Sequence, residues 1–497
     1  MKVAIIGSGF SSLSNACYLA KHGYDVTVYE KNEQLGGRAR IMQKDGFIFD
    51  MGPSWYWMPD VFESFFADFN KKVSDYYELV RLDPSYQVFW QDTPDNIPAS
   101  LDDLKAYFEK YETGSAAKLE QFLAEAKTKY IIGMGDFVTK PSLSIAEFMT
   151  IDTARKGLSL DLFKPISKHI RQFFKHPKLI ELLEFPVLFL GAKPQQTPSL
   201  YSLMNYADIV LGTWYPKGGM NEIVQAMVSL GKELGVNYVT NANVTSIVTQ
   251  GNRCTGLQCE ENFYEADVVV SGADYHHTEQ KLLDTAQRNY SESYWEKRVM
   301  APSSLLYYVG LDTKVDALLH HNLFFDADFN QHAVEIYDTH KWPKKPLFYI
   351  CCPSKTDETV APAGKENVFI LIPVSTELED TEDERQRYFD LVADRLVNHL
   401  GVDIRKHIEV YETFAHKDFV SNYNSFKGNA YGLANTLKQT AFLKPKCKSN
   451  KLNNLYYTGQ LTVPGPGVPP AIISGKVVAD LIQKEHQNES VIRSNIN

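Results

Sequence analysis

The first thirty residues of this chain form a complete strand–turn–helix–strand unit, and no other segment constrains the fold as strongly. An apolar strand is expected over Lys2 to Ile6, and Gly7-Ser8-Gly9 follows it as a tight turn. An amphipathic helix is expected over Ser11 to His22 and a second strand over Tyr24 to Tyr29. Two glycines let the backbone approach a pyrophosphate, whose charge is stabilised at the helix N-terminus. The unit therefore predicts a Rossmann-like domain that binds a dinucleotide.

An acidic residue stands where this motif requires one. Glu30 lies 21 residues after Gly9, and an acid about 20 residues beyond the turn binds a ribose hydroxyl. The third glycine of the motif is replaced by Ser12, which is still small enough for close packing of helix on strand. We expect Gly7, Gly9, Ser12, Glu30 and the adjacent Lys31 to contact the nucleotide. The alternative is the same unit without a ligand.

The next segment indicates which dinucleotide binds. Residues 31–40 read KNEQLGGRAR and residues 49–54 read FDMGPS, where a nicotinamide domain normally continues with further strand–helix units. This order of motifs resembles the FAD-containing amine oxidase and phytoene desaturase superfamily. An arginine suits a phosphate because its planar fork donates two hydrogen bonds, although a glycine turn with a solvated arginine is the alternative. By the resemblance, the expected FAD contacts are Gly36, Gly37, Arg38, Gly52 and Pro53.

The C-terminal region supports the same cofactor. Residues 454–479 read NLYYTGQLTVPGPGVPPAIISGKVVA, with a strand, a loop rich in glycine and proline, and then a helix. Prolines fit the first turn of a helix, and the positive end of the helix stabilises negative charge on a flavin. The segment resembles the C-terminal flavin segment of bacterial carotenoid desaturases. That resemblance places Gly459, Gly467, Val468 and Pro469 at the flavin.

A third segment lies in the middle of the chain, in the sequences GVNYVTNANVTS (235–246) and ADVVVSGADYHH (266–277). In the superfamily a valine backbone at this point contacts the adenine, which corresponds to Val244; an ordinary strand residue is the alternative. His276 and His277 do not indicate a metal site, because adjacent side chains point apart on a strand and no further ligand is suitably spaced. We expect no bound metal.

The composition limits the remaining possibilities. A chain of 497 residues indicates two or three domains. The net charge of −10 disfavours general binding of nucleic acid. Six cysteines without metal or CxxC spacing indicate reduced thiols and a cytoplasmic location. No signal peptide fits the first residues, and no apolar stretch reaches the roughly 18 residues of a membrane-spanning helix.

The motifs predict an α/β fold whose Rossmann-like FAD-binding domain is assembled from discontinuous segments. A mixed-sheet substrate domain and a helical, membrane-facing subdomain complete it. The expected parts are residues 1–65, 216–280 and 441–485 for the FAD domain, 66–215 for the helical region, 281–440 for the substrate domain and 486–497 for a flexible tail.

One stretch of the helical region predicts contact with a membrane surface. In Leu158 to Leu183, basic residues recur every three or four positions, beside an aromatic and aliphatic stripe. Such a helix lies in the headgroup region of an anionic bilayer. The alternative is a surface helix that packs its apolar stripe on its own domain. The basic residues are Lys164, Lys168, Arg171 and Lys175, and the apolar ones are Phe163, Ile166, Ile170, Phe173 and Phe174. The apolar run 185–190 reads either as core or as the mouth of a substrate tunnel.

Over nearly its whole length the chain resembles the bacterial phytoene desaturase family most closely, through MGPSWYWMPDVF (51–62), WYPKGGM (214–220) and TGQLTVPGPGVPP (458–470). The resemblance implies FAD-dependent desaturation of a linear polyene, phytoene towards lycopene, in carotenoid biosynthesis. It also implies oxygen or a quinone as electron acceptor and peripheral association with the inner face of the cell membrane.

No catalytic base stands out from the sequence. Asp50, Tyr56 and Asp274 are candidates near the flavin, with a structural cap, a tunnel wall and a nucleotide contact as their respective alternatives. Hydride transfer to the flavin mainly requires that the polyene is aligned in a tunnel that excludes water. The candidate lining of this tunnel is Trp55-Tyr56-Trp57.

Four other functions stay open. A hydroxycarotenoid 3,4-desaturase and a carotene isomerase share the scaffold. A flavin amine oxidase fits the hydrophobic insert and the GPGVPP loop less well. A non-enzymatic prenyl-lipid chaperone, such as a Rab GDP-dissociation inhibitor, would not need Glu30 or the Gly-Gly-Arg turn.

Overall fold

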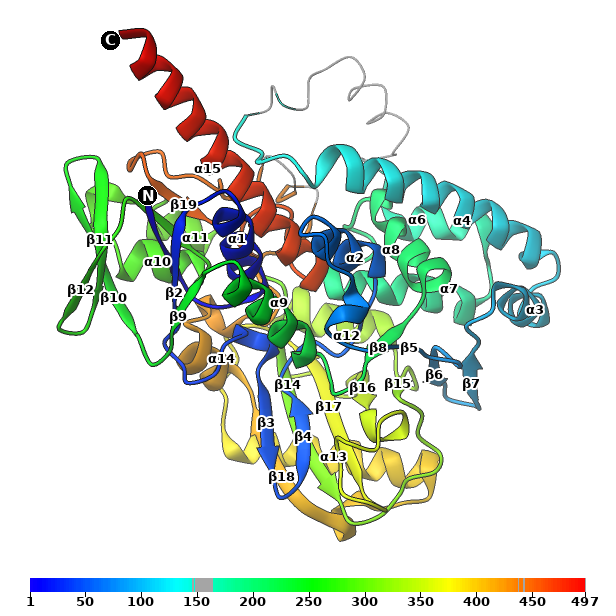
Figure 1. Ribbon diagram of the computed structural model, residues 1–497. Helices are drawn as coiled ribbons and strands as arrows, with labels where there is room; N and C mark the ends of the chain where they lie inside the picture. Colours follow the sequence, from blue (N-terminus) through cyan, green and yellow to red (C-terminus); the bar gives the residue numbers. More distant parts are fainter. Residues whose placement is uncertain (145–146, 148–163, 437, 441–442, 497) are drawn as a thin grey trace.

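The structure is a computed structural model, and it describes all residues except 145–146, 148–163, 437, 441–442 and 497. Segments from the beginning, middle and end of the chain meet in one parallel sheet (Figure 1). Its five strands run in the order β19-β13-β1-β2-β9. They are β1 (Lys2–Ile6), β2 (Asp25–Tyr29), β9 (Asn237–Val239), β13 (Val268–Ser271) and β19 (Leu455–Tyr457). The discontinuous Rossmann-like domain expected from the motifs is therefore present.

Small residues bring the helices of this domain close together. The helix after the glycine turn, α1 (Phe10–Lys21), packs between α9 (Asn221–Glu233) and α15 (Val468–Ile496). A Cβ on Gly475 of α15 would lie 2.3 Å from the carbonyl oxygen of Ser11, so only glycine fits there. Asn15 and Ser14 of α1 donate side-chain hydrogen bonds to carbonyl oxygens of α15. Helix α15 continues through residues 486–496, where the sequence predicted a flexible tail.

A small antiparallel sheet borders the parallel one. It consists of β10 (Val244–Gln250), β11 (Arg253–Cys259) and β12 (Asn262–Glu265). Its buried side chains share a core with the parallel sheet and with α10 (Tyr275–Lys281) and α11 (Glu292–Glu296). This arrangement places Val244, the first residue of β10, near the end of β2.

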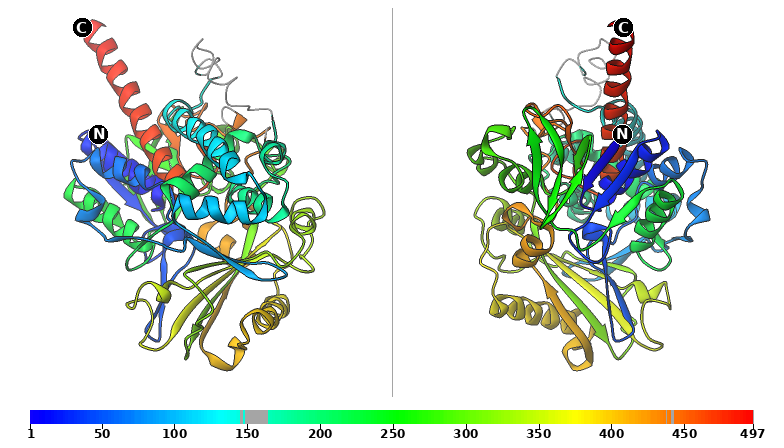
Figure 2. Two further views of the ribbon diagram at one scale, coloured as in Figure 1. Left: turned by 90° about the vertical axis from the view of Figure 1, so that its right-hand side faces the viewer. Right: turned by 60° about the vertical axis from the view of Figure 1, so that its left-hand side comes forward.

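A second, seven-stranded sheet forms the opposite end of the molecule (Figure 2). All its neighbouring strands are antiparallel except β15 and β6. Side chains of β14 alternate between two cores, one under α13 (Glu382–Leu400) and one facing the helical region. In spatial order the strands are β18 (Ile408–Phe414), β14 (Ser303–Leu311), β17 (Glu366–Val374), β16 (Phe348–Cys351), β15 (His321–Phe324), β6 (Tyr86–Phe89) and β7 (Pro94–Ile97).

Two of these strands lie in the region that the sequence predicted as helical. Strands β6 and β7 pair with each other and extend the second sheet through a parallel contact between β6 and β15. Two antiparallel strand pairs complete the described strands. One is the hairpin of β3 (Ile41–Lys44) and β4 (Phe47–Asp50), and the other joins β5 (Leu79–Arg81) to β8 (Trp214–Pro216), which is distant in the sequence.

Five of the described helices cover one side of the second sheet, and their apolar faces share its core. They are α3 (Leu101–Tyr111), α4 (Ser115–Ile132), α6 (Ile166–Phe173), α7 (Pro177–Glu184) and α8 (Leu203–Tyr206). Helix α2 (Pro59–Ala67) instead buries Phe62, Phe65 and Phe66 in the core of the parallel sheet. Helices α12 (Phe329–Tyr337) and α14 (His416–Tyr423) lie in the connections of the sheet. No helix in the described part of the chain is long and apolar enough to cross a membrane.

The stretch predicted as one amphipathic helix is two short helices in its described part. A break at residues 174–176 separates α6 from α7, which begins at Pro177 because proline fits a first helical turn. Ile166, Ile170 and Phe174 are buried in the core, whereas Lys168 and Arg171 are exposed. Here the apolar stripe packs on its own domain. Phe163 lies outside the described residues.

Candidate active site

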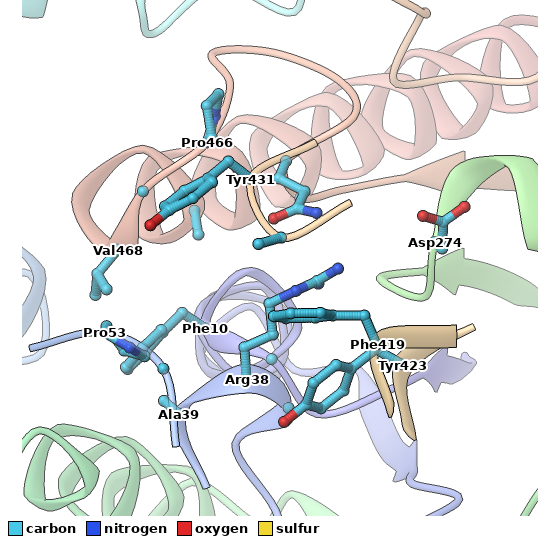
Figure 3. Close-up of a pocket in the computed structure, with 18 of the residues that line it drawn as sticks. Phe10, Arg38, Ala39, Pro53, Asp274, Phe419, Tyr423, Tyr431, Pro466 and Val468 are labelled. Atoms are coloured by element: carbon cyan, nitrogen blue, oxygen red, sulfur yellow. The ribbon is translucent and has the colours of Figure 1, made fainter. Parts of the chain in front are cut away.

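One continuous cavity of about 440 Å³ joins the parallel sheet to the space between the second sheet and the helical region. Its first half, the nucleotide half, is walled by the β1–α1 turn, the Gly-Gly-Arg turn, the loop after β13 and the start of α15. Figure 3 shows part of this half, with Arg38 and Tyr423 opposite Tyr431 and Val468. The second half, the apolar half, lies against the seven-stranded sheet.

The glycine turn leaves room for a ligand. Gly9 is the N-cap of α1, and a Cβ placed on it would meet no protein atom within 4 Å. Gly37, with a φ of +58°, comes so close that its own Cβ would lie 3.2 Å from the Cα of Gly9. The two turns therefore meet at the cavity, with open space beside Gly9 where a pyrophosphate would approach an array of backbone N–H groups.

Ser12 does not line the cavity. It is fully buried, and its hydroxyl would be 1.9 Å from a Cβ on Gly272, at the end of β13. Its role is thus the close helix–strand packing that the third glycine of the motif usually serves. Gly7 lines the cavity and lies against the backbone of Gly272.

Glu30 lies at the end of β2 with its carboxylate held in place from two sides. One oxygen accepts hydrogen bonds from the backbone N–H and hydroxyl of Ser8, at 3.0 and 2.7 Å. The other accepts bonds from the backbone and side-chain amides of Asn32, at 2.9 and 2.8 Å. Glu30 is only 4% exposed and lines the cavity beside Lys31. The acid is therefore fixed at the wall where the motif requires a ribose contact.

Arg38 offers an unused donor to the same cavity. Its guanidinium lies 5.2 Å from the ring centroid of Tyr423 and donates to the hydroxyl of Ser425. Its Nε is buried without a hydrogen-bond partner, and burial lowers the pKa of the group, opposed by the nearby carboxylate of Asp274. A buried donor of this kind calls for an acceptor, which a phosphate oxygen supplies.

The two other segments expected at the cofactor also reach the cavity. Gly459, Gly467, Val468 and Pro469 line it where α15 begins, and Val244 lines it next to β10. The hydroxyl of Ser474 accepts the backbone N–H of Gly459 at 3.0 Å, which fastens the loop to the helix. The helix therefore directs its positive dipole end at the cavity.

Of the cofactor contacts expected from the sequence, Ser12 alone does not line the cavity; Gly36, Gly37, Gly52 and Pro53 do, with the residues described above. The open space at Gly9, the unpartnered Arg38 Nε and the end of α15 together fit an FAD. They would hold its pyrophosphate and the negative side of its ring.

Two of the three candidate bases lie outside this cavity. The Asp50 carboxylate accepts the backbone N–H groups of Met220 and Asn221, at 2.8 and 3.1 Å, and so caps α9; burial raises its pKa to about 7. Tyr56 is fully buried, and its hydroxyl pairs with that of Tyr77 at 3.0 Å. Asp50 is thus a structural cap, the alternative named for it from the sequence. Tyr56 is a core residue, because its ring packs against Phe62 of α2 and not toward the cavity.

Asp274 does line the cavity. It caps α10 by accepting the backbone N–H of His277 at 3.2 Å, and it accepts that of Phe426 at 3.2 Å. Burial raises the pKa of its carboxyl, opposed by these two hydrogen bonds. Capping α10 accounts for the position of the Asp274 carboxylate. Because the residue also lines the cavity, it can contact a bound ligand.

The apolar half contains most of the residues that the sequence motifs missed. Trp55 and Trp57 of the predicted aromatic lining are present, as is Phe185 from the apolar run 185–190. The charged side chains among the described lining residues all lie in the nucleotide half. The additional wall residues are Met204, Leu306, Leu323, Phe325, Ile336, Tyr337, Leu347, Phe348, Tyr349, Leu371, Pro373 and Tyr431. Several of these residues, such as Leu371 and Pro373, lie two positions apart on one strand. Alternate residues of a strand face the same side of the sheet, so this spacing in the sequence could have indicated a shared wall.

Comparison with known proteins agrees with this geometry. The family model described as flavin containing amine oxidoreductase matches residues 11–483. A carotenoid 3,4-desaturase of Haloarcula japonica is 41% identical over 97% of both chains. The chain belongs to the carotenoid desaturase family of flavin-containing amine oxidoreductases. A zeta-carotene-forming phytoene desaturase of Myxococcus xanthus is 29% identical over 96% of this chain and 93% of its own.

Solved structures show the same fold at low identity. A crystal structure of an oxidoreductase from Methanosarcina mazei has a TM-score of 0.64 at 15% identity, with 97% of this chain and 100% of that chain covered. A Rab GDI from Plasmodium falciparum has a TM-score of 0.56 at 12% identity, with 96% of both chains covered. The fold alone therefore does not distinguish an enzyme from a non-enzymatic lipid chaperone. Membership of the desaturase family identifies the protein as an enzyme.

The protein is an FAD-dependent oxidoreductase. The α/β fold, the family and the cofactor predicted from the sequence are confirmed. When bound, FAD supplies the hydride acceptor, which no amino-acid side chain provides. Glu30 and Arg38 would hold the cofactor, and the apolar half would present the reacting substrate to it.

Proposed function

We propose that the protein desaturates a linear carotenoid precursor, with phytoene converted towards lycopene. The observation that carries this proposal is the division of one cavity into a charged nucleotide half and an apolar half without charged side chains among its described walls. A long hydrocarbon needs a wall of this kind, since a buried charge next to it would lack a partner. An amine substrate would instead need an anion or an aromatic cage around its cation.

The chain contributes alignment rather than a nucleophile. The sheet residues Leu323, Leu371 and Tyr349 and the facing Trp55 and Phe185 hold the polyene so that one C–C bond meets the flavin. Fixing two reactants in one geometry lowers the barrier by removing their freedom of motion. The proton that leaves with the hydride goes to a group of the cavity wall or to water. Asp274, in the nucleotide half, is a lining carboxylate that is not committed to fixing the glycine turn.

A second candidate is 3,4-desaturation of a hydroxylated carotenoid. The identity of 41% to the Haloarcula enzyme, against 29% to the Myxococcus phytoene desaturase, favours it. The hydroxyl of Tyr337, which lines the apolar half, would accommodate a hydroxylated end group.

Product analysis with both substrates separates these candidates. The FAD-loaded protein is incubated in liposomes with phytoene or with a hydroxylated carotenoid, and the products are separated by chromatography. New polyenes from phytoene, with little turnover of the hydroxylated substrate, support the first proposal. Turnover of the hydroxylated carotenoid alone supports the second, and turnover of neither refutes both.

Location and electron acceptor are part of the proposal. The substrate dissolves in bilayers, so the protein works at the inner face of the cell membrane from the cytoplasm, with oxygen or a quinone as acceptor. The exposed Lys168 and Lys175 would meet the anionic headgroups, whereas Arg171 is ion-paired with the buried Glu184. Sedimentation with anionic vesicles, and its loss when Lys168, Lys175 and Arg171 are replaced by glutamine in a variant that is shown to be folded, would support the membrane contact. Equal sedimentation of the variant would exclude these residues as the contact.

A further inference from the structure

A cluster of potential metal ligands lies on the second sheet, outside the residues that bind FAD. Strands β15 and β16 pair antiparallel with His321 directly opposite Cys351, and His320 precedes β15. One ring nitrogen of each histidine and the Cys351 sulfur lie within 4.8 Å of one another. The three residues are 5%, 0% and 2% exposed.

A neighbouring hydroxyl lies within hydrogen-bond distance of the Nδ1 atom of each histidine. His320 Nδ1 lies 2.8 Å from the Thr356 hydroxyl, and His321 Nδ1 lies 2.6 Å from the Tyr349 hydroxyl. Tyr349 donates its own hydrogen to Ser54, so His321 Nδ1 must be the donor to Tyr349. That tautomer leaves a lone pair on Nε2. A metal-bound imidazole usually donates its far N–H to an acceptor, and the Tyr349 hydroxyl is such an acceptor for His321.

The Nε2 atoms of both histidines are buried without a hydrogen-bond partner. Burial lowers the pKa of His320 to about 3 and that of His321 well below its usual value, so both rings are neutral. A buried ring nitrogen without a partner is costly in a folded protein, whether it carries a proton or a lone pair. With Nδ1–H donated to Thr356 and Tyr349, both Nε2 atoms have a lone pair, and a cation that accepts these lone pairs removes that cost.

A small space adjoins the cluster at His320 and Cys351. It measures about 10 Å³ and is also lined by Asp50, Ser54 and Tyr215, among others. That is about the space of one water molecule.

We propose that His320, His321 and Cys351 bind one Zn²⁺, with a water in the small space as the fourth ligand. Zinc bonds of about 2.0 Å to nitrogen and 2.3 Å to sulfur place tetrahedral ligand atoms roughly 3.3–3.6 Å apart. From separations of at most 4.8 Å, the three atoms therefore need to close by up to about 1.5 Å, which calls for side-chain rotation on binding. Imidazole and thiolate select zinc over magnesium or calcium. Binding converts the Cys351 thiol to a thiolate and releases its proton to solvent.

The site would act on the wall of the substrate cavity. The His321 ring stacks on Trp55, with 4.0 Å between centroids and 11° between planes, and Trp55 lines the apolar half. A metal on His321 would fix that stacking pair and join β15 to β16. Its role is thus to shape the tunnel, with no change of oxidation state.

The test measures metal content and ligand identity on the full-length protein. Wild-type protein and the variants Cys351→Ser and Cys352→Ser are analysed for zinc, and then titrated with Co²⁺ after chelation. Cys352 is a matched control, because it is equally buried but its sulfur lies 3.1 Å from Glu366 instead. We expect equimolar zinc and a thiolate-to-cobalt absorption band in the wild type and in Cys352→Ser, and neither in Cys351→Ser.

Two results would overturn the proposal. One is wild-type protein that binds neither zinc nor Co²⁺ in equimolar amount; this result does not depend on the folding of any variant. The other is a cobalt–thiolate band that survives in Cys351→Ser. A rise in the unfolding temperature of the wild type on adding zinc, absent in Cys351→Ser, would support it.

Discussion

Replacing Glu30 tests the assignment of the nucleotide half most sharply. In Glu30→Ala a buried ribose hydroxyl of FAD would lose its carboxylate partner, which costs about 1–3 kcal/mol. This corresponds to a dissociation constant for FAD that is roughly 5- to 150-fold higher. The hydrogen bonds that Glu30 accepts from Ser8 and Asn32 are lost both with and without FAD. They therefore lower the stability of the variant but largely cancel in its affinity for FAD.

The assay is a titration of flavin-free protein with FAD, followed by flavin fluorescence or calorimetry, after circular dichroism shows that the variant is folded. Asp25→Asn is the matched control, since Asp25 is an exposed acid at the other end of β2. FMN is the control ligand, because it lacks the adenosine ribose and its affinity should not change. Unaltered FAD affinity in folded Glu30→Ala, or an equal loss for FMN, would refute the ribose assignment.

Four further predictions concern the two halves of the cavity and one buried lysine. Gly9→Ala should fold normally, because no protein atom lies near the added Cβ, yet bind FAD about tenfold or more weakly in the same titration. Leu371→Glu should keep its bound flavin, as seen in the visible spectrum, and lose turnover of the polyene, whereas Leu371→Met should retain both. Asp274→Asn keeps an acceptor for the α10 cap, so its unfolding temperature should equal that of the wild type. A loss of kcat in this variant would identify Asp274 as the base, and an unchanged kcat would show that it serves only as a cap. Lys444 is buried without a partner, and burial lowers its pKa to about 7. The folded protein then binds fewer protons than the unfolded chain between pH 7 and about 10, so its stability should rise over that range; urea unfolding of Lys444→Met should lack this rise, and an identical pH profile would contradict the assignment.

Much of the nucleotide half follows from local sequence. Short motifs with fixed backbone requirements can each be recognised without knowledge of the rest of the chain. They are the glycine turn, Glu30, the Gly-Gly-Arg turn and the loop before α15. Their convergence from three distant segments follows from the family resemblance. Ser12 shows the limit of a motif, because packing against Gly272 rather than a ligand explains it.

The apolar half depends on contacts between distant segments, which periodicity alone does not show. Strands β6 and β7 are short, and only their pairing with β15 places them in the second sheet. The aromatic run at residues 55–57 alternates, so Trp55 and Trp57 face the cavity and Tyr56 faces away from it. Cys351 reaches His321 through strand register, although thirty residues separate them in the sequence.

The most direct test of the account is an anaerobic single turnover. Protein loaded with FAD is mixed without oxygen with phytoene in liposomes, and flavin and polyene absorbance are followed together. The account predicts that the flavin band bleaches as polyene bands of longer wavelength appear, in equal amounts. A flavin that stays oxidised with phytoene and with hydroxylated carotenoids, but is bleached by an amine, would contradict it.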